Sequence, residues 1–232
     1  MKLLAFETAT EACSVALYLD GEVRERFEVA PRRHAELALP WAQALLAEAG
    51  IARAQLDAVA VGRGPGAFTG VRLAIALAQG IALALDRPLV PVSTLEVLAG
   101  AAGDGPERIL AAIDARMGEV YAGAFLRTDD GLALLGPEQV LPPAAVRLPG
   151  PGPWQGVGTG FAAADGLLAR HLGADLAQVE PGALPRAGVL ARLAATAFAR
   201  GEAVAAGQVE PAYLRDNVAL TLAEQQALRA AR

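Results

Sequence analysis

Two stretches of this chain follow the same order of features. Residues 3–21 and 109–131 each contain an apolar strand that ends in an acid (Glu7, Asp114), a polar turn, a second strand and an Asp-Gly turn. A weaker similarity relates "VAVGRGPGAF" (59–68) to "QGVGTGFAAA" (155–164). Strand-turn patterns are common in α/β domains, but here the acid and the glycines recur at the same points in the order. The pattern favours an internal duplication.

Apolar patterning predicts an α/β fold in each copy. We expect strands at 3–9, 13–19, 22–30, 57–61 and 88–92, with helices at 33–49 and 69–85. Residues 135–154 are dense in proline and glycine and predict irregular structure, followed by helices at 186–200 and 222–230. We therefore predict a first lobe of residues 1–104 and a second of 105–232, whose last helix can return to the first lobe.

Charge and cysteine content exclude several classes of function. The net charge of −5 gives little basis for autonomous nucleic-acid binding, so any nucleic acid is expected to be held through a partner. The single cysteine, Cys13, excludes an internal disulfide and a multi-cysteine metal site, and is expected to be a buried small hydrophobe. Arg72 and Gln79 interrupt the longest apolar run, so we expect no membrane span and a cytoplasmic protein.

The glycine-rich loop at 62–66 allows two interpretations. Its backbone amides and the following helix could cradle an anion, or Gly62, Gly64 and Gly66 could take positive φ in a tight strand-to-helix turn. The spacing matches neither specific phosphate-binding motif, and no lysine follows. The loop alone favours the structural turn.

The two helices of the first half carry apolar stripes. The helix after the glycine loop is apolar nearly all round, so it needs cover on more than one side, from the second lobe, the first helix or a partner. The first helix has Leu37, Trp41 and Leu45 at four-residue spacing, which is typical of a core stripe but also of an interface.

Candidate catalytic groups are sparse. His34 and His171 are far apart and neither has a second histidine at the spacing of a zinc pair. Glu7 and Asp114 end equivalent strands, where paired carboxylates could hold magnesium or merely cap turns. Ser93 or Thr94 is expected to cap a helix, and a nucleophile there would lack an obvious base.

Segments along the whole chain resemble one family. These are "ETATEACSVAL", "GRGPGAFTGVRLAIALAQG", "PLVPVSTLEVLA", "ILAAIDARMGEVYAG", "GVGTGF" and "AYLRDNVA". They are similar to the TsaB (YeaZ) subunit of the bacterial complex that makes threonylcarbamoyladenosine next to the tRNA anticodon. The resemblance implies two RNase H-like lobes of the actin/Hsp70/sugar-kinase (ASKHA) fold, and a non-catalytic relative of the transferase subunit TsaD. In TsaD two histidines hold a metal, whereas Thr94 and Leu98 occupy those positions here, which implies no metal.

The resemblance also implies partners. The first two helices would pack against the equivalent helices of TsaD, or against a second copy when TsaD is absent, with the ATPase TsaE acting nearby. The isolated chain would carry no cofactor, with ATP or ADP at the partner interface, and tRNA would be bound only through the complex. The residues assigned to the interface are Leu37, Trp41, Leu45, Val71, Arg72, Ile75, Ala78 and Gln79. The residues assigned to a vestigial nucleotide cleft are Glu7, Thr8, Thr10, Gly64, Gly66 and Asp114.

The leading hypothesis is therefore a scaffold that activates the transferase without turnover of its own. The alternative is a weak ATPase or metallopeptidase-like hydrolase of the same fold. Glu7 stands where known family members usually have Asp, and this weakens the case for direct nucleotide binding.

Overall fold

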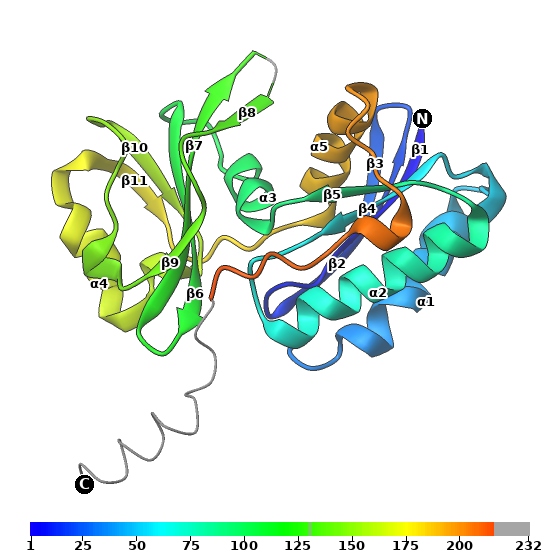
Figure 1. The fold of residues 1–232 in the computed structure, drawn as a ribbon, viewed down its shortest axis with the longest axis horizontal. Helices are drawn as coiled ribbons and strands as arrows, with labels where there is room; N and C mark the ends of the chain where they lie inside the picture. The colour runs from blue at the N-terminus through cyan, green and yellow to red at the C-terminus, as the bar shows by residue number, and fades with distance from the viewer. Residues whose placement is uncertain (130, 216–232) are drawn as a thin grey trace, which may run out of the picture.

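The chain folds into two lobes that lie side by side (Figure 1). The computed structural model describes residues 1–129 and 131–215. The helix expected at 222–230 lies outside the described residues. Each lobe is built on one mixed β-sheet with helices on both faces.

The first sheet begins with a three-stranded meander. Its strands are β1 (Lys2–Glu7), β2 (Ala12–Leu19), β3 (Glu22–Val29), β4 (Ala58–Gly62) and β5 (Leu89–Val92). They lie in the order β3-β2-β1-β4-β5, and β1 pairs antiparallel with β2 and parallel with β4. All five predicted strands are present, with ends within two residues of those expected.

The second sheet repeats this arrangement. Its strands are β6 (Arg108–Arg116), β7 (Glu119–Thr128), β8 (Gly131–Leu134), β9 (Gln139–Leu141), β10 (Trp154–Val157) and β11 (Leu176–Glu180). The order β8-β7-β6-β10-β11 matches that of the first sheet, again with an antiparallel meander and a parallel fourth strand. The predicted duplicated, two-lobed α/β fold is confirmed. One expectation is corrected, because β9 is an ordered strand on β7 within the stretch predicted to be irregular.

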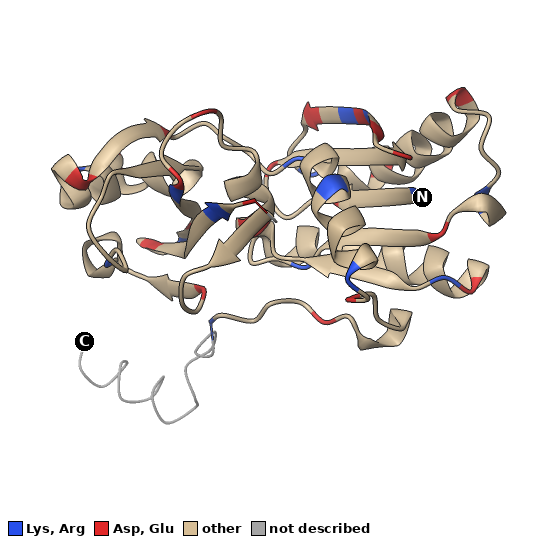
Figure 2. Ribbon diagram, turned by 90° about the horizontal axis from the view of Figure 1, so that it is seen from above, with Lys and Arg blue, Asp and Glu red and all other residues tan. Residues whose placement is uncertain are grey.

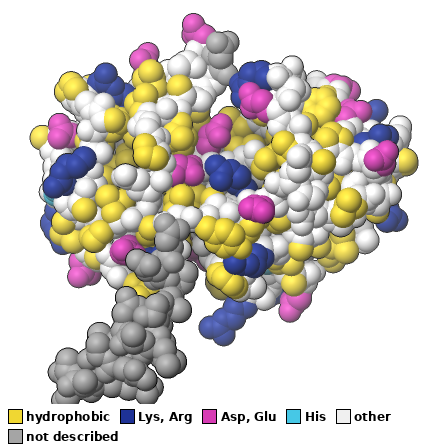
Figure 3. All heavy atoms as spheres, viewed as in Figure 1, with side chains coloured by type: hydrophobic (Ala, Val, Ile, Leu, Met, Phe, Trp, Pro, Cys, Tyr) yellow, Lys and Arg dark blue, Asp and Glu magenta, His cyan; other side chains and the backbone are white. Residues whose placement is uncertain are grey.

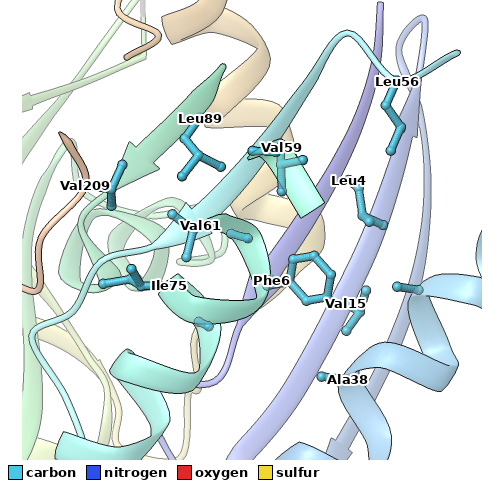
Figure 4. Close-up of a cluster of buried hydrophobic side chains, with 14 of the residues drawn as sticks. Leu4, Phe6, Val15, Ala38, Leu56, Val59, Val61, Ile75, Leu89 and Val209 are labelled. Atoms are coloured by element: carbon cyan, nitrogen blue, oxygen red, sulfur yellow. The ribbon is translucent and has the colours of Figure 1, made fainter. Parts of the chain in front are cut away.

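Strand alternation divides the first lobe into two cores. Leu4 and Phe6 face the cluster beneath α1 (His34–Glu48) and α2 (Phe68–Leu85), whereas Leu3 and Ala5 face α5 (Ala187–Ala199). Successive side chains of a strand point to opposite faces, so a continuous apolar strand is covered on both sides. Figure 4 shows the first of these clusters.

The two halves of the sequence exchange helices. The helix α3 (Thr94–Gly100) comes from the first half and packs on the second sheet, while α5 comes from the second half and packs on the first. The other face of the second sheet is covered by α4 (Ala163–Leu172). This corrects the expected division at residue 104, because apolar periodicity shows that a helix has a buried face but not which sheet covers it. Short 3₁₀ turns occupy Arg53–Gln55, Pro143–Ala145, Thr159–Phe161, Gly173–Asp175 and Ala206–Gln208.

After α5, residues 203–215 form what we call the strap, which runs along α2 and then reaches the second lobe (Figure 1). Val204 and Leu89 exchange backbone hydrogen bonds of 2.8 and 2.9 Å. Gln79 Nε2 on α2 donates to the carbonyls of Ala206 and Val209 at 3.0 and 3.1 Å. At its far end Arg215 donates to the carbonyl of Ala115 in β6. The strap is therefore hydrogen-bonded to β5 and α2 of the first lobe and to β6 of the second lobe.

Candidate partner surface and interlobe cleft

The glycine-rich loop is closed against the end of β1. A Cβ on Gly66 would lie 2.3 Å from the Ala9 carbonyl oxygen, and one on Gly70 would lie 2.0 Å from that of Thr8. Ala67 N donates to Ala9 O, and Thr8 Oγ1 donates to Gly70 O, both at 2.7 Å. The glycines thus permit close backbone packing, as the structural interpretation expected. Of Gly62, Gly64 and Gly66 only Gly64 has positive φ (88°), which corrects the expectation for the other two.

Glu7 is sealed inside the first lobe. It is fully buried beneath Gly62, where a Cβ would overlap its carboxylate. Its oxygens accept hydrogen bonds from Ala9 N at 2.9 Å and from Thr94 Oγ1 at 3.2 Å. Desolvation by burial raises the pKa of Glu7 to about 7, despite the opposing effect of these hydrogen bonds. A carboxyl in this position cannot reach a bound nucleotide.

Asp114, the equivalent acid of the second lobe, lies on the surface of the interlobe cleft. Its carboxylate accepts hydrogen bonds from the side chain and the backbone N–H of Arg116, both at 2.8 Å. Of the residues expected to form a vestigial nucleotide cleft, Thr10, Gly66 and Asp114 line it, whereas Glu7, Thr8 and Gly64 are buried. The paired-carboxylate arrangement is therefore not formed, and the residues do not fit a magnesium nucleotide.

Thr94 and Leu98, which the resemblance equates with the metal-binding histidines of the transferase, belong to the core. Thr94 is buried against Glu7, and Leu98 packs in the cluster beneath the second sheet. His34 Nε2 is bonded to the Thr10 carbonyl at 2.9 Å, and His171 lies beside Arg147 in the second lobe. Within residues 1–129 and 131–215, no group of three or more His, Cys, Asp or Glu side chains is arranged to hold a metal.

Ser93 does have a carboxylate beside it. Its hydroxyl caps α3 by accepting from Leu95 N at 3.1 Å, as predicted, and donates to Glu138 of the second lobe. Burial raises the pKa of Glu138, which also lies 3.9 Å from an Arg63 nitrogen. Sequence reasoning missed this base because Glu138 is 45 residues away in the chain. The Ser93 side chain is buried, so the contact joins the lobes rather than facing a substrate.

The expected interface stripe faces inward. The side chains of Leu45, Val71, Ile75 and Ala78 are buried in the core of the first lobe, and Figure 4 places Ile75 beside Val61 and Val209. Leu37 and Trp41 are half-buried against the same core, and Gln79 holds the strap. The assignment of those four buried residues to a partner surface is therefore corrected. Because α2 is apolar all round, its sequence did not show which face meets its own sheet.

The opposite face of α2 is the one left open. Thr69, Ala76, Gly80, Leu83 and Ala84 are exposed, and Leu73 and Leu77 are half-buried. Leu83 alone leaves 69 % of its surface accessible. The helix is long and apolar enough to cross a membrane by length and composition alone, yet its inner face belongs to the core. Small residues at 76 and 80 would let a second helix approach closely.

The interlobe cleft has a volume of about 1050 Å³ and is lined by both lobes and the strap. At its mouth the Arg72 guanidinium lies 3.3 Å from the Phe68 ring centroid and 5.1 Å from that of Tyr213. Arg72 also donates to the Tyr213 hydroxyl at 2.6 Å. Sequence reasoning missed Phe68, Leu83 and Tyr213. The only available signal was that a second apolar stripe on α2 remained once the core stripe was assigned.

The comparisons with known proteins cover nearly the whole chain. The chain is 44% identical over 228 residues to the tRNA threonylcarbamoyladenosine biosynthesis protein TsaB of Escherichia coli K12, covering 94% of this chain and 96% of that protein. The Haemophilus influenzae TsaB is 39% identical, with 94% and 95% covered. This chain belongs to the TsaB (YeaZ) family. The solved structure of YeaZ from Pseudomonas aeruginosa superposes on it with a TM-score of 0.86 at 47% identity, covering 92% of this chain and 99% of that one.

A model of the TsaD family, tRNA N6-adenosine threonylcarbamoyltransferase, also matches residues 27–222. TsaB-family chains thus share the architecture of a transferase family. In this TsaB-family chain the first-lobe acid, Glu7, is sealed beneath Gly62.

Proposed function

We propose that this chain is a non-catalytic subunit that binds a TsaD-type transferase and serves threonylcarbamoyladenosine formation in tRNA. The observation that carries the proposal is the exposed apolar face of α2. Apolar side chains and small residues line the open side of one helix over about four turns, from Thr69 to Leu83. Packing this face against a helix pair of another chain removes apolar surface from water on both sides.

The proposed partner is a TsaD homologue, with TsaE joining the pair and a second copy of this chain using the same face when TsaD is absent. A two-fold pair suits a self-complementary helical surface. The lobes of the transferase share this architecture, so equivalent helices can meet face to face. ATP or ADP would act at the interface or on the partners rather than at Glu7.

The alternative, a weak ATPase or hydrolase, finds little support at the cleft. Glu7 is buried, Asp114 is paired with Arg116, and the glycine loop is packed against β1. A thermal shift separates the two functions, because ATP at a hundred times its dissociation constant would stabilise the folded chain by about 2.7 kcal/mol. We expect no shift for the isolated protein.

Reconstitution tests the proposal directly. Purified TsaD, TsaE and the enzyme that supplies threonylcarbamoyl-adenylate are combined with tRNA, with and without this chain, and the modified nucleoside is measured. We expect product only with the chain. The variant Leu83→Glu should lose both co-elution with TsaD and product formation, while its far-UV circular dichroism spectrum stays like that of the wild type, because the side chain is exposed on the single chain and its replacement leaves the lobe folded.

Leu134→Glu is the matched control. Leu134 lies on β8 of the second lobe and is 49 % exposed, so the variant adds the same charge away from α2. Ile75→Glu is not a usable probe, since a buried carboxylate would unfold the lobe. Equal modification without the chain, or normal co-elution of Leu83→Glu with TsaD, would refute the proposed function.

A further inference from the structure

The charge of the cleft lining differs from that of the protein as a whole. Acidic and basic residues alternate over both lobes in Figure 2, and the net charge is −5. Among the described residues, the cleft lining nevertheless holds four arginines against two acids: Arg32, Arg72, Arg116 and Arg215 against Glu11 and Asp114. A cleft in which an acidic protein gathers arginines favours an anionic ligand.

Two of these arginines have no carboxylate partner in the part of the chain that the structure describes. Arg116 pairs with Asp114, and Arg215 pairs with Glu119. Among the described residues, Arg32 and Arg72 form no ion pair with an acid. Arg72 is held instead by the Phe68 carbonyl at 3.1 Å and by the Tyr213 hydroxyl. Its full positive charge therefore remains available beside the cleft.

Aromatic rings stand beside these cations. Phe68 is 69 % exposed and Tyr213 is 58 % exposed, and the Arg72 guanidinium lies over both rings, closer to that of Phe68. Because Phe68 and Tyr213 group around one cation in the cleft lining instead of being scattered singly, they form a patch that a ligand can cover. Figure 3 shows hydrophobic side chains together with both basic and acidic ones where the two lobes meet.

Rings alternating with arginines are the combination that holds single-stranded nucleic acid, in which bases stack on rings and phosphates meet guanidinium groups. A magnesium nucleotide does not fit, because Glu7 is sealed and Asp114 is already paired. We propose that the cleft mouth binds unpaired nucleotides of an RNA strand, with Phe68 and Tyr213 stacking on bases and Arg32 and Arg72 meeting phosphates. The inference rests on the proposed function for the identity of the RNA, which would be the tRNA being modified.

The first test uses the isolated chain and a fluorescein-labelled single-stranded RNA of about 12 nucleotides, within the span of known single-strand sites. Binding is followed by fluorescence anisotropy over a series of salt concentrations. We expect Phe68→Ala to weaken binding roughly five- to a hundredfold, as the loss of one stacked base does. Arg32→Asn should reduce the slope of log K against log salt by about 0.7, the value for one phosphate contact on a single strand.

Asparagine is chosen because Arg32 has a positive φ of 69°, which asparagine tolerates. The matched control is Arg53→Ala, which removes one exposed arginine outside the cleft. It should bind as the wild type does. Equal weakening by Arg53→Ala, unchanged binding by Phe68→Ala and Arg32→Asn, or no binding by the wild type at low salt would each overturn the inference.

A second measurement separates RNA from a protein occupant. If Phe68→Ala loses co-elution with TsaD but binds RNA normally, the cleft mouth is a protein interface and the inference is wrong. Leu83→Glu should behave in the opposite way, losing TsaD while the isolated chain still binds RNA. Failure of the proposed function and failure of the RNA site therefore give different results.

Discussion

The Ser14 hydroxyl accepts a hydrogen bond of 2.9 Å from the backbone N–H of Ala187, a residue 173 positions later in the chain. The same hydroxyl donates to Glu25 Oε1 at 2.8 Å, and that oxygen accepts from Gly188 N at 2.9 Å. Arg186 holds the other carboxylate oxygen at 2.8 Å. Two side chains of the first sheet thus cap α5, which has no cap from its own side chains.

We predict that Ser14→Ala destabilises the protein by about 1–2 kcal/mol, because it leaves the Ala187 N–H buried without an acceptor. Urea unfolding of the purified chain measures the change. The exposed pair of Arg24 and Glu22 gives the control, since Glu22→Gln should change stability by less than about 1 kcal/mol. Equal effects of the two substitutions would contradict the capping role of Ser14.

The raised pKa of Glu7 predicts that the stability of the folded protein depends on pH. Its pKa in the folded protein is about 7, above the ordinary value of 4.5, so the folded state binds the proton more tightly than the unfolded chain does. The free energy of unfolding should therefore fall by up to about 3 kcal/mol as pH rises from 4.5 through 7.

Glu7→Gln removes this titration while keeping the shape of the side chain. We expect the variant and the wild type to have similar stability near pH 4.5, and the variant to be more stable above pH 7. Urea unfolding across this range measures the difference. A constant offset between the two proteins at every pH would show that Glu7 does not titrate in this window.

Two glycines give opposite predictions. A Cβ at Gly66 would lie 2.3 Å from the Ala9 carbonyl, whereas one at Gly80 on α2 would meet nothing within 4 Å. We expect Gly66→Ala to cost about 1–3 kcal/mol by overpacking, and Gly80→Ala to stabilise the isolated chain by up to about 1 kcal/mol through helix propensity. Thermal unfolding compares them, and a shift of both melting temperatures in one direction would refute the packing account.

The two hydrogen bonds from Gln79 predict that this residue stabilises the strap locally. Gln79→Ala removes two hydrogen bonds to the carbonyls of Ala206 and Val209. We expect hydrogen exchange in residues 203–212 to quicken by about tenfold, as the loss of about 1.4 kcal/mol of local protection implies. Exchange in β1 and β6 serves as the internal control, and uniform acceleration there would indicate global destabilisation instead.

The sequence predicted local structure well because local structure depends on near neighbours. The apolar runs of β1 and β2, the Asp-Gly turn at residue 20 and the cap at Ser93 all follow from residues a few positions apart. The recurrence of Glu7 and Asp114 in the same order predicted two copies of one fold. Glycine spacing also favoured a structural turn at 62–66, and the close approach of Gly66 to Ala9 supports that interpretation.

The sequence could not predict which face of α2 is buried and which is exposed. Ile75 and Leu83 are equally apolar, and a helix that is apolar all round gives no periodicity from which to choose between them. Likewise, no residue close to Ser93 in the sequence predicts its hydrogen bond to Glu138, and no residue close to Arg72 predicts its contact with Tyr213. These pairs are brought together only when the two lobes and the strap assemble.

By itself the sequence determined the α/β class, the duplication, the strands of the first sheet and the absence of histidines at positions 94 and 98, because each is a property of residue type and local order. Only the tertiary structure decided that Glu7 is sealed, that α3 and α5 exchange sheets, and which side of α2 is free. The physical reason is that burial depends on which surfaces meet, and that is settled by the packing of the whole chain rather than by any one segment.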